Sequence, residues 1–366
     1  MARARTVIAI GGAGATALAL GIAVPQAMAG TQAGARAVVP SASAWKLVYE
    51  HHYGRAAAQN GFDAIVVPSS RQAWAFGGSD NFTGRPVAAH FSGGRWRPSP
   101  LPAGLTSDIF AASASSPRNV WAVVGLGQAV LRWNGSRWSV AKSWHVGSEV
   151  QLTGVTALST TNVWVFGSGG FTGGLGTWHY NGSTWKHLTR GAAVGITKAS
   201  AVSSSNMWAI GSLSAPQDSI VHFSHGRWER VSAAAIGHHQ FQAILALSAT
   251  DVWVIATPAT NQKTTYLMHY NGNRWSRVSV PGTAAQNGQL LGLNADGHGG
   301  FWVETVHRIL HRNAAGRWLA SHANTHHVFS LAPIPGTSSV LAPSAAPEPG
   351  SSSGSDAVVF ENSSLG

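Results

Sequence analysis

The sequence contains no cysteine among its 366 residues. This absence excludes disulfide bonds, thiolate metal ligands and a thiol nucleophile. It also excludes a lipid anchor attached through cysteine. An exported form of this chain must therefore be held together by packing.

Charged residues are scarce as well, at 10% of the chain, and carboxylates number only 13 against 24 lysines and arginines, which gives a formal net charge of +11. Hydrolysis by an acid/base pair needs two carboxylates across a cleft. Asp63 and Asp108 are the pair that we would propose, and Glu149 and Glu304 are weaker candidates. The alternative is that these carboxylates only solvate a channel.

Catalytic and cofactor motifs are missing. The chain has no Gly-rich phosphate loop, no Gly-x-Ser-x-Gly nucleophile turn and no His-Glu-x-x-His zinc motif. The sequence therefore indicates no cofactor and favours binding over catalysis.

Long apolar runs are confined to the N-terminus. Arg3 and Arg5 precede an apolar stretch over residues 6–24, and Ala27-Met28-Ala29 forms a small-x-small site. This pattern is typical of a secretory signal peptide over residues 1–29, followed by a linker over 30–42. A retained membrane anchor is the alternative. We expect a secreted, extracellular, bacterial monomer without membrane insertion after cleavage and without a nucleic-acid partner.

Tryptophan, by contrast, is abundant, with 16 residues, of which twelve repeat in register. A first tryptophan in an Asn-Val-Trp-like strand recurs at intervals of 43 to 49 residues, at Trp74, Trp121, Trp164, Trp208, Trp253 and Trp302. A second follows an Asn-Gly or related turn, at Trp96, Trp138, Trp185, Trp228, Trp275 and Trp318. Asn134-Gly135 predicts a type I′ hairpin. This period, with short strands and no helical pattern, is typical of a β-propeller blade.

A seventh, incomplete copy follows the six complete ones. Leu341 takes the place of the first tryptophan, and the copy ends near residue 362 before any fourth strand. The segment at Trp45 resembles that missing strand. We predict an all-β fold over residues 43–366: a seven-bladed β-propeller of four-stranded antiparallel blades, with the last blade closed by the N-terminal strand. The Pro/Gly/Ser-rich loop 343–356 is expected to be disordered.

The repeats resemble those of secreted bacterial, actinomycete-type β-propellers, distantly related to the kelch and galactose-oxidase type. That resemblance implies an extracellular, carbohydrate-binding or catalytic propeller. The sequence departs from the pattern: only Gly77 and Gly78 show a kelch-like glycine pair, and the absence of cysteine does not support galactose-oxidase copper chemistry. The segment Tyr180 to Trp185 lacks the aspartate of a sialidase Asp-box and is interpreted as a hairpin.

Polar residues flank the conserved apolar position of each first strand and are expected to face the channel mouth by strand alternation. We predict that they form the ligand-binding site, with a solvated channel mouth as the alternative. They are Asp63, Asp108, Gln151, Thr153, Thr197, Gln240, Gln242, Gln289 and Ser330.

Histidines and arginines also recur at fixed positions of the repeat. His90, His179, His222 and His269 share a third-strand position, which indicates packing, whereas the pairs His238-His239 and His326-His327 are weak metal candidates. Arginines before the second tryptophan would either pack over indole rings or attract a polyanion. They are Arg95, Arg137, Arg227, Arg274 and Arg317.

The leading hypothesis is a binding or scaffold module that recognises a glycan, a cell-envelope polymer or a protein on its variable-loop face. The alternative is a lyase or hydrolase that uses Asp63 and Asp108, with or without a divalent cation.

Overall fold

The structure is a computed structural model. It describes residues 45–365, except for gaps at 55–57, 80–83, 126–128, 145–149, 170–174, 189–194, 213–217, 233–238, 259–263, 320, 327, 329 and 352. The expected signal peptide and linker lie outside these residues. Among the described residues, no helix has the length and apolar character needed to cross a bilayer.

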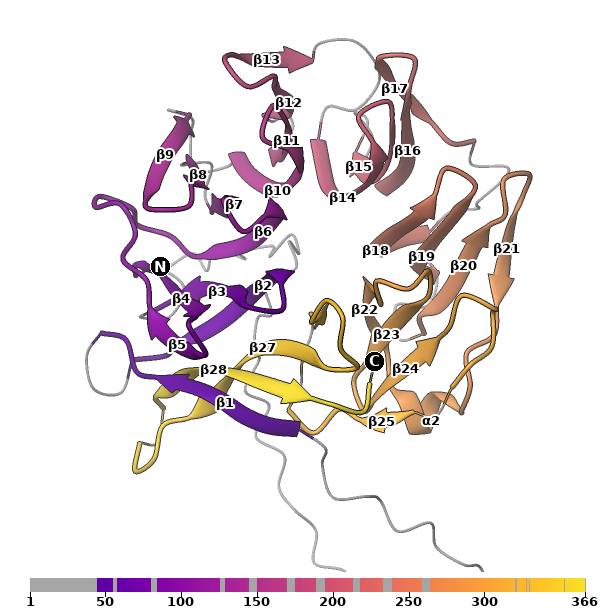
Figure 1. The fold of residues 1–366 in the computed structure, drawn as a ribbon. Helices are drawn as coiled ribbons and strands as arrows, with labels where there is room; N and C mark the ends of the chain where they lie inside the picture. The colour runs from indigo at the N-terminus through magenta and orange to yellow at the C-terminus, as the bar shows by residue number, and fades with distance from the viewer. Residues whose placement is uncertain are drawn as a thin grey trace, which may run out of the picture.

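Seven four-stranded antiparallel sheets form a ring around a central axis (Figure 1). The first three blades follow each other along the chain. Blade 1 contains β2 (Gly61–Ser69), β3 (Gln72–Gly78), β4 (Pro86–Ser92) and β5 (Arg95–Pro98). Blade 2 contains β6 (Ile109–Ser116), β7 (Asn119–Val124), β8 (Ala129–Trp133) and β9 (Trp138–Ser143). Blade 3 contains β10 (Val150–Ser159), β11 (Asn162–Gly169), β12 (Gly176–Tyr180) and β13 (Trp185–Leu188).

The next three blades repeat this order from the inner strand outward. Blade 4 contains β14 (Gly195–Ser203), β15 (Asn206–Ser212), β16 (Asp218–Ser224) and β17 (Arg227–Arg230). Blade 5 contains β18 (His239–Ser248), β19 (Asp251–Pro258), β20 (Tyr266–Tyr270) and β21 (Trp275–Val278). Blade 6 contains β22 (Leu290–Ala295), β23 (Phe301–Thr305), β24 (Arg308–Arg312) and β25 (His322–Ala323). A short helix, α2 (Ala284–Asn287), precedes β22 and is capped by Thr283.

Blade 7 combines the two ends of the described chain. It contains β26 (Ala332–Pro333), β27 (Val340–Pro347), β28 (Ser355–Asn362) and, as its outermost strand, β1 (Trp45–His51). β1 runs antiparallel to β28, with Trp45 opposite Asn362 and His51 opposite Ala357 (Figure 1). The ring is therefore joined through backbone hydrogen bonds between segments that are far apart in sequence.

Seven of the fourteen residues in the expected disordered loop 343–356 are instead strand. Residues 343–347 continue β27, and Ser355 and Asp356 begin β28, so that pairing extends to Pro347 opposite Ser355. Glu348 N donates to Gly354 O at 3.0 Å and closes the turn. The prolines are tolerated because the remaining residues of β27 still pair with β28. The prediction of disorder, which rested on composition alone, was therefore wrong for the residues that pair.

The core lies between adjacent blades and is dominated by the first tryptophan of each repeat. Trp74, Trp121, Trp253 and Trp302 are almost completely buried, each in a cluster that joins two blades. In blade 3, the Trp164 Nε1 group donates to Asn162 Oδ1 at 2.8 Å, and the same oxygen lies 3.0 Å from His179 Nε2. Blade 5 repeats this arrangement around Asp251. The asparagine or aspartate two residues before the tryptophan thus satisfies two buried nitrogens.

The third-strand histidines pack as predicted. Their rings stack on the first tryptophan of the same blade, with centroid distances from 3.9 to 4.2 Å, at His90, His179, His222 and His269. Burial lowers the pKa of His90, His179 and His222 because it disfavours the charged imidazolium.

The Asn-Gly hairpins differ from the prediction. In blade 2, Asn134 pairs with Arg137, so Gly135 and Ser136 are the central turn residues, and only Gly135 has a positive φ, of 100°. The Asn134 side chain accepts hydrogen bonds from the Ser136 and Arg137 N–H groups. This is a glycine-first turn supported by an asparagine side chain, not a type I′ turn centred on Asn-Gly.

Candidate functional site

Each inner strand of the six complete blades contains one extra residue near the variable-loop face, the face that carries the connections between second and third strands. The register with the second strand shifts around this residue, as in a β-bulge, at Asp63, Phe110, Thr153, Thr197, Gln242 and Leu291. A bulge bends the strand and re-aims the unpaired side chain. The residue after the conserved apolar position is therefore oriented by the bulge, and not by the simple alternation that we assumed.

Asp63 and Asp108 are brought together at this face by the inner strands of blades 1 and 2. Asp63 is the bulge residue of β2, and Asp108 directly precedes β6. Asp108 is only 8% exposed, and its Oδ1 atom is buried without a hydrogen-bond partner. Its backbone oxygen accepts a 2.8 Å hydrogen bond from Gly125 N, which fixes the start of the strand. One carboxylate oxygen of the proposed pair is therefore unsatisfied.

One glycine of blade 1 makes room for this carboxylate. A Cβ atom on Gly78 would lie 2.1 Å from Asp108 Oδ1, and one on Gly77 would lie 1.9 Å from Gly61 O. Neither position can carry a side chain without movement of its neighbours. Gly78 is thus the surface against which the Asp108 carboxylate of the next blade rests, whereas Gly77 lies against the inner strand of its own blade.

Both carboxyl groups have raised pKa values. Burial raises the pKa of Asp63 to about 7, and the nearby Asp108 charge adds to this increase. Burial raises the pKa of Asp108 to about 6. Because two close carboxylates resist simultaneous ionisation, the pair holds a proton near neutral pH.

Three of the other seven predicted site residues use their hydrogen bonds within the scaffold. Thr153 donates to Ile196 O, Thr197 Oγ1 donates to Ile210 O at 3.1 Å, and Gln242 Nε2 donates to Thr257 Oγ1 at 2.9 Å. These groups join inner strands to their neighbours and have little capacity left for a ligand. Gln240 is exposed, and the remaining members are partly buried at Gln151, Gln289 and Ser330.

A second pair of buried charges was not predicted as a pair. Glu304 in β23 is completely buried and accepts a 2.7 Å hydrogen bond from Asn294 Nδ2. Lys198 in β14 lies beside a cavity of about 180 Å³ that Phe110 and Thr153 also line. Burial raises the pKa of Glu304 and lowers that of Lys198, and the attraction between the two groups opposes both changes. A lysine in an inner strand that otherwise carries small residues was the sequence signal for this feature.

The two described metal candidates, His239 and His326, contact aromatic side chains. His239 lies 2.7 Å, through Nε2, from the Tyr266 hydroxyl, and His326 stacks on Phe360 with ring centroids 4.0 Å apart. His238 and His327 lie outside the described residues. Within the described part of the chain, no group of three or more His, Asp or Glu side chains could hold a metal ion.

The arginines before the second tryptophan are all exposed, at Arg95, Arg137, Arg227, Arg274 and Arg317. Arg227 pairs with Glu229 at 2.6 Å. In the described residues, contacts of arginine with tryptophan rings are made instead by third-strand residues, such as Arg132 over Trp121 and Arg312 over Trp253. The packing interpretation is thus wrong for the hairpin arginines, because the turn carries them beyond the indole into solvent.

The comparisons with known proteins agree on the fold. A scan against protein-family models finds no match, and neither does a search of curated proteins. Among solved structures, YCF48 bound to D1 peptide is 14% identical with a TM-score of 0.58, and the alignment covers 89% of this chain and 99% of that one. The RRP9 WD40 repeats are 10% identical with a TM-score of 0.59, covering 88% and 98%. Virginiamycin B lyase from Staphylococcus aureus is 10% identical with a TM-score of 0.56, covering 87% and 99%. At these identities the likeness shows a β-propeller and nothing finer.

Proposed function

We propose that this chain is an exported binding module that takes a peptide or protein partner at the variable-loop end of its channel, where Asp63 and Asp108 receive a basic group. The observation that carries the proposal is the buried Asp108 Oδ1 atom without a partner, resting on Gly78. A buried acceptor without a donor costs free energy, and an ammonium or guanidinium group would supply the donor. The signal-like residues 1–29 support export.

A basic side chain fits this site better than a neutral glycan. Thr153, Thr197 and Gln242 are already hydrogen-bonded to the scaffold, which removes three of the polar groups that could bind sugar hydroxyls. The Asp108 Oδ1 atom is buried without a partner, and a cationic donor bonds to a carboxylate more strongly than a neutral hydroxyl does. The structural neighbours include a propeller bound to a peptide and WD40 repeats, which is compatible with a protein ligand.

The test uses a library of short, otherwise neutral peptides with one lysine or arginine at a varied position, and a matched library with glutamine in its place. At about pH 8, where both carboxyl groups are largely ionised, we expect enrichment of the basic peptides, and at about pH 5 we expect its loss. Asp108→Asn should abolish the enrichment. The net charge of +11 repels basic peptides in general, so their capture would require a specific site. Equal capture of both libraries, or an unaffected Asp108→Asn variant, would contradict the proposal.

A second candidate function is acid/base hydrolysis or elimination at the same carboxyl pair. The raised pKa values of Asp63 and Asp108, about 7 and about 6, favour it, because the two groups can differ in protonation near neutral pH. Turnover of a polysaccharide or cyclic peptide by the wild type, lost in both Asp63→Asn and Asp108→Asn, would support this function over simple binding.

A further inference from the structure

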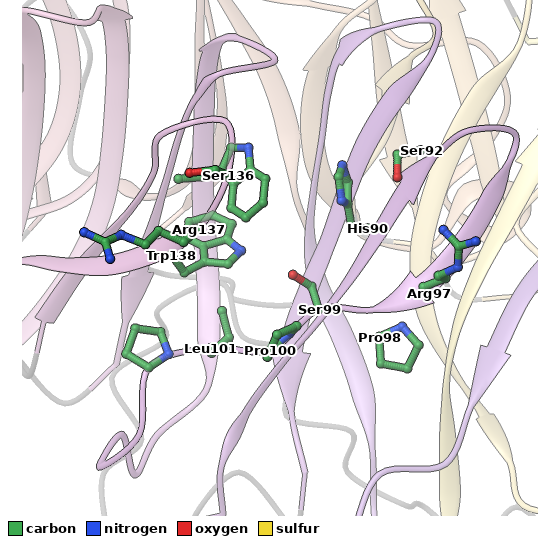
Figure 2. A pocket seen from close by; sticks show the side chains of 12 residues that line it. His90, Ser92, Arg97, Pro98, Ser99, Pro100, Leu101, Ser136, Arg137 and Trp138 are labelled. Atoms are coloured by element: carbon green, nitrogen blue, oxygen red, sulfur yellow. The ribbon is translucent and has the colours of Figure 1, made fainter.

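A groove of about 450 Å³ lies on the lateral wall of the propeller, between the outer strands of blades 1 and 2 (Figure 2). Its lining comes from β4, β5, the chain that leads from blade 1 to blade 2, and the hairpin of β8 and β9. Asp63 and Asp108 belong to the inner strands and do not line it. A ligand in this groove would therefore occupy a site independent of the proposed function.

The groove is preformed. Pro98, Pro100 and Pro102 form part of its wall, and the proline rings fix the backbone there. The intervening Ser99 N donates a 2.8 Å hydrogen bond to Ala88 O, which ties this wall to the sheet of blade 1. Little conformational entropy would be lost when a ligand binds to such a wall.

The floor is aromatic. Trp133 lines the groove, with its ring 5.5 Å from Trp74, 5.7 Å from His90 and 5.8 Å from Trp138. Trp133 remains partly exposed, whereas Trp138 is buried, with 8% of its surface exposed. In blades 3 and 5 the matching residues are Tyr180 and Tyr270, whose hydroxyls bond to the turn. Blade 2 therefore presents a larger apolar ring at this position, held in place from three sides.

The ends of the groove are cationic. Figure 2 shows Arg97 and Arg137 at opposite sides, with Ser99, His90 and Trp138 between them. Both arginines are exposed, and no aspartate or glutamate lines the groove. Two guanidinium groups without an acidic neighbour in the lining favour a ligand that carries more than one anionic group.

We propose that this groove binds an acidic glycan, a chain of sugar rings that carry carboxylates. The apolar face of a sugar ring would pack on Trp133, and the carboxylates would pair with the two arginines. The ring hydroxyls would bond to Ser92 and Ser99 and would donate to the Ser136 hydroxyl, whose own proton is donated to Asn134 Oδ1. An acidic peptide would use the arginines but leave the serine hydroxyls and the indole without matching groups. The combination of a partly exposed indole, serine hydroxyls and separated cations therefore favours the uronic-acid type of polymer.

The experiment measures binding of trigalacturonate to the full chain by titration calorimetry. Its methyl ester has the same rings without the charges, and triglutamate has the charges without the rings. We expect binding of trigalacturonate, weakened at least about tenfold for the ester and for triglutamate. Arg97→Gln and Arg137→Gln should each weaken binding several-fold, and the double variant at least about tenfold. Arg274→Gln is the matched control, because Arg274 holds the same hairpin position in blade 5 but lies outside the groove.

Trp133→Leu separates the aromatic contribution from the charges, and it should weaken trigalacturonate more than triglutamate. Should that variant fail to fold, the exposed arginine variants carry the test alone. The proposal is overturned if trigalacturonate does not bind, if the double arginine variant binds it like the wild type, or if Arg274→Gln weakens it equally. Triglutamate binding as tight as trigalacturonate binding would also overturn it, because the groove would then recognise charge alone.

Discussion

Replacing Asp63 by asparagine should stabilise the folded protein at neutral and alkaline pH. The substitution keeps the size and shape of the side chain but removes the charge that burial and Asp108 disfavour. An acid whose pKa is higher in the folded than in the unfolded state binds its proton more tightly when folded. Its ionisation therefore lowers stability as the pH rises from the unfolded value through the folded value.

The magnitude follows from the pKa of Asp63. A rise from 3.8 to about 7 corresponds to an upper bound of about 4 kcal/mol, at about 1.4 kcal/mol for each unit. Asp63 is partly exposed, and solvent screening and relaxation reduce this cost, so we expect about 1–2 kcal/mol. The stability difference between Asp63→Asn and the wild type should be near zero at about pH 4 and reach this value at about pH 8.

The assay is denaturant unfolding of both proteins at several pH values, with the difference in free energy plotted against pH. Asp251→Asn is a suitable control, because Asp251 is already hydrogen-bonded to Trp253 and His269 and because asparagine occupies the same place in blade 3. This variant should not gain stability as the pH rises. If Asp63→Asn is less stable than the wild type at about pH 8, or if the difference does not change with pH, the reasoning about the carboxyl pair is wrong.

Three further predictions concern the scaffold. Gly78→Ala should lower the free energy of unfolding by at least about 2 kcal/mol, and Asp108→Ala should largely restore it in a double-mutant cycle. Gly154→Ala is the control: its Cβ would have its nearest contact at 3.7 Å, so it should not couple to Asp108. Trp45→Ala should cost about 3–5 kcal/mol in chemical unfolding, and deletion of β1 should promote association in size-exclusion chromatography because it exposes the edge of β28. Hydrogen bonds from His311 and two backbone N–H groups outweigh burial and hold the pKa of Asp296 below its usual value, so Asp296→Ala should lose more stability at about pH 7 than at about pH 3.

The fold could be predicted because the repeat fixes both the number and the order of the strands. Each first tryptophan fills the space between two blades, so its spacing along the chain reports the spacing of the blades. The last blade was harder, because its inner strand β26 is only two residues long and the place of the tryptophan is taken by Leu341. The spacing of the earlier repeats still located β27 and β28, because strands with different side chains can pair in the same way.

The errors share one physical cause: local composition does not report which hydrogen bonds the folded chain makes, whether across a sheet or within a turn. Residues 343–347 look like a linker, yet they pair with β28. The Asn134-Gly135 pair looks like the centre of a turn, yet Asn134 precedes the two central residues and accepts hydrogen bonds from the turn with its side chain. For the site, Asp63 and Asp108 could be proposed from their positions in the repeat. The bulge that orients Asp63 and the hydrogen bond that Thr197 donates to Ile210 O depend on the register of the sheets, which the sequence does not show.

A repeat protein supplies its own standard of comparison, because a residue required only for packing should recur in most blades. Two departures from the repeat lie in blades 1 and 2. The Asp108 carboxylate rests on Gly78 on the inner side, and Trp133 and the proline-rich wall form the groove on the outer side. At the second departure, Trp133 stands where blades 3 and 5 have a tyrosine that bonds its own turn. Packing alone does not require these exchanges, so we expect substitutions in blades 1 and 2 to affect binding more than the equivalent substitutions in blades 3 and 5.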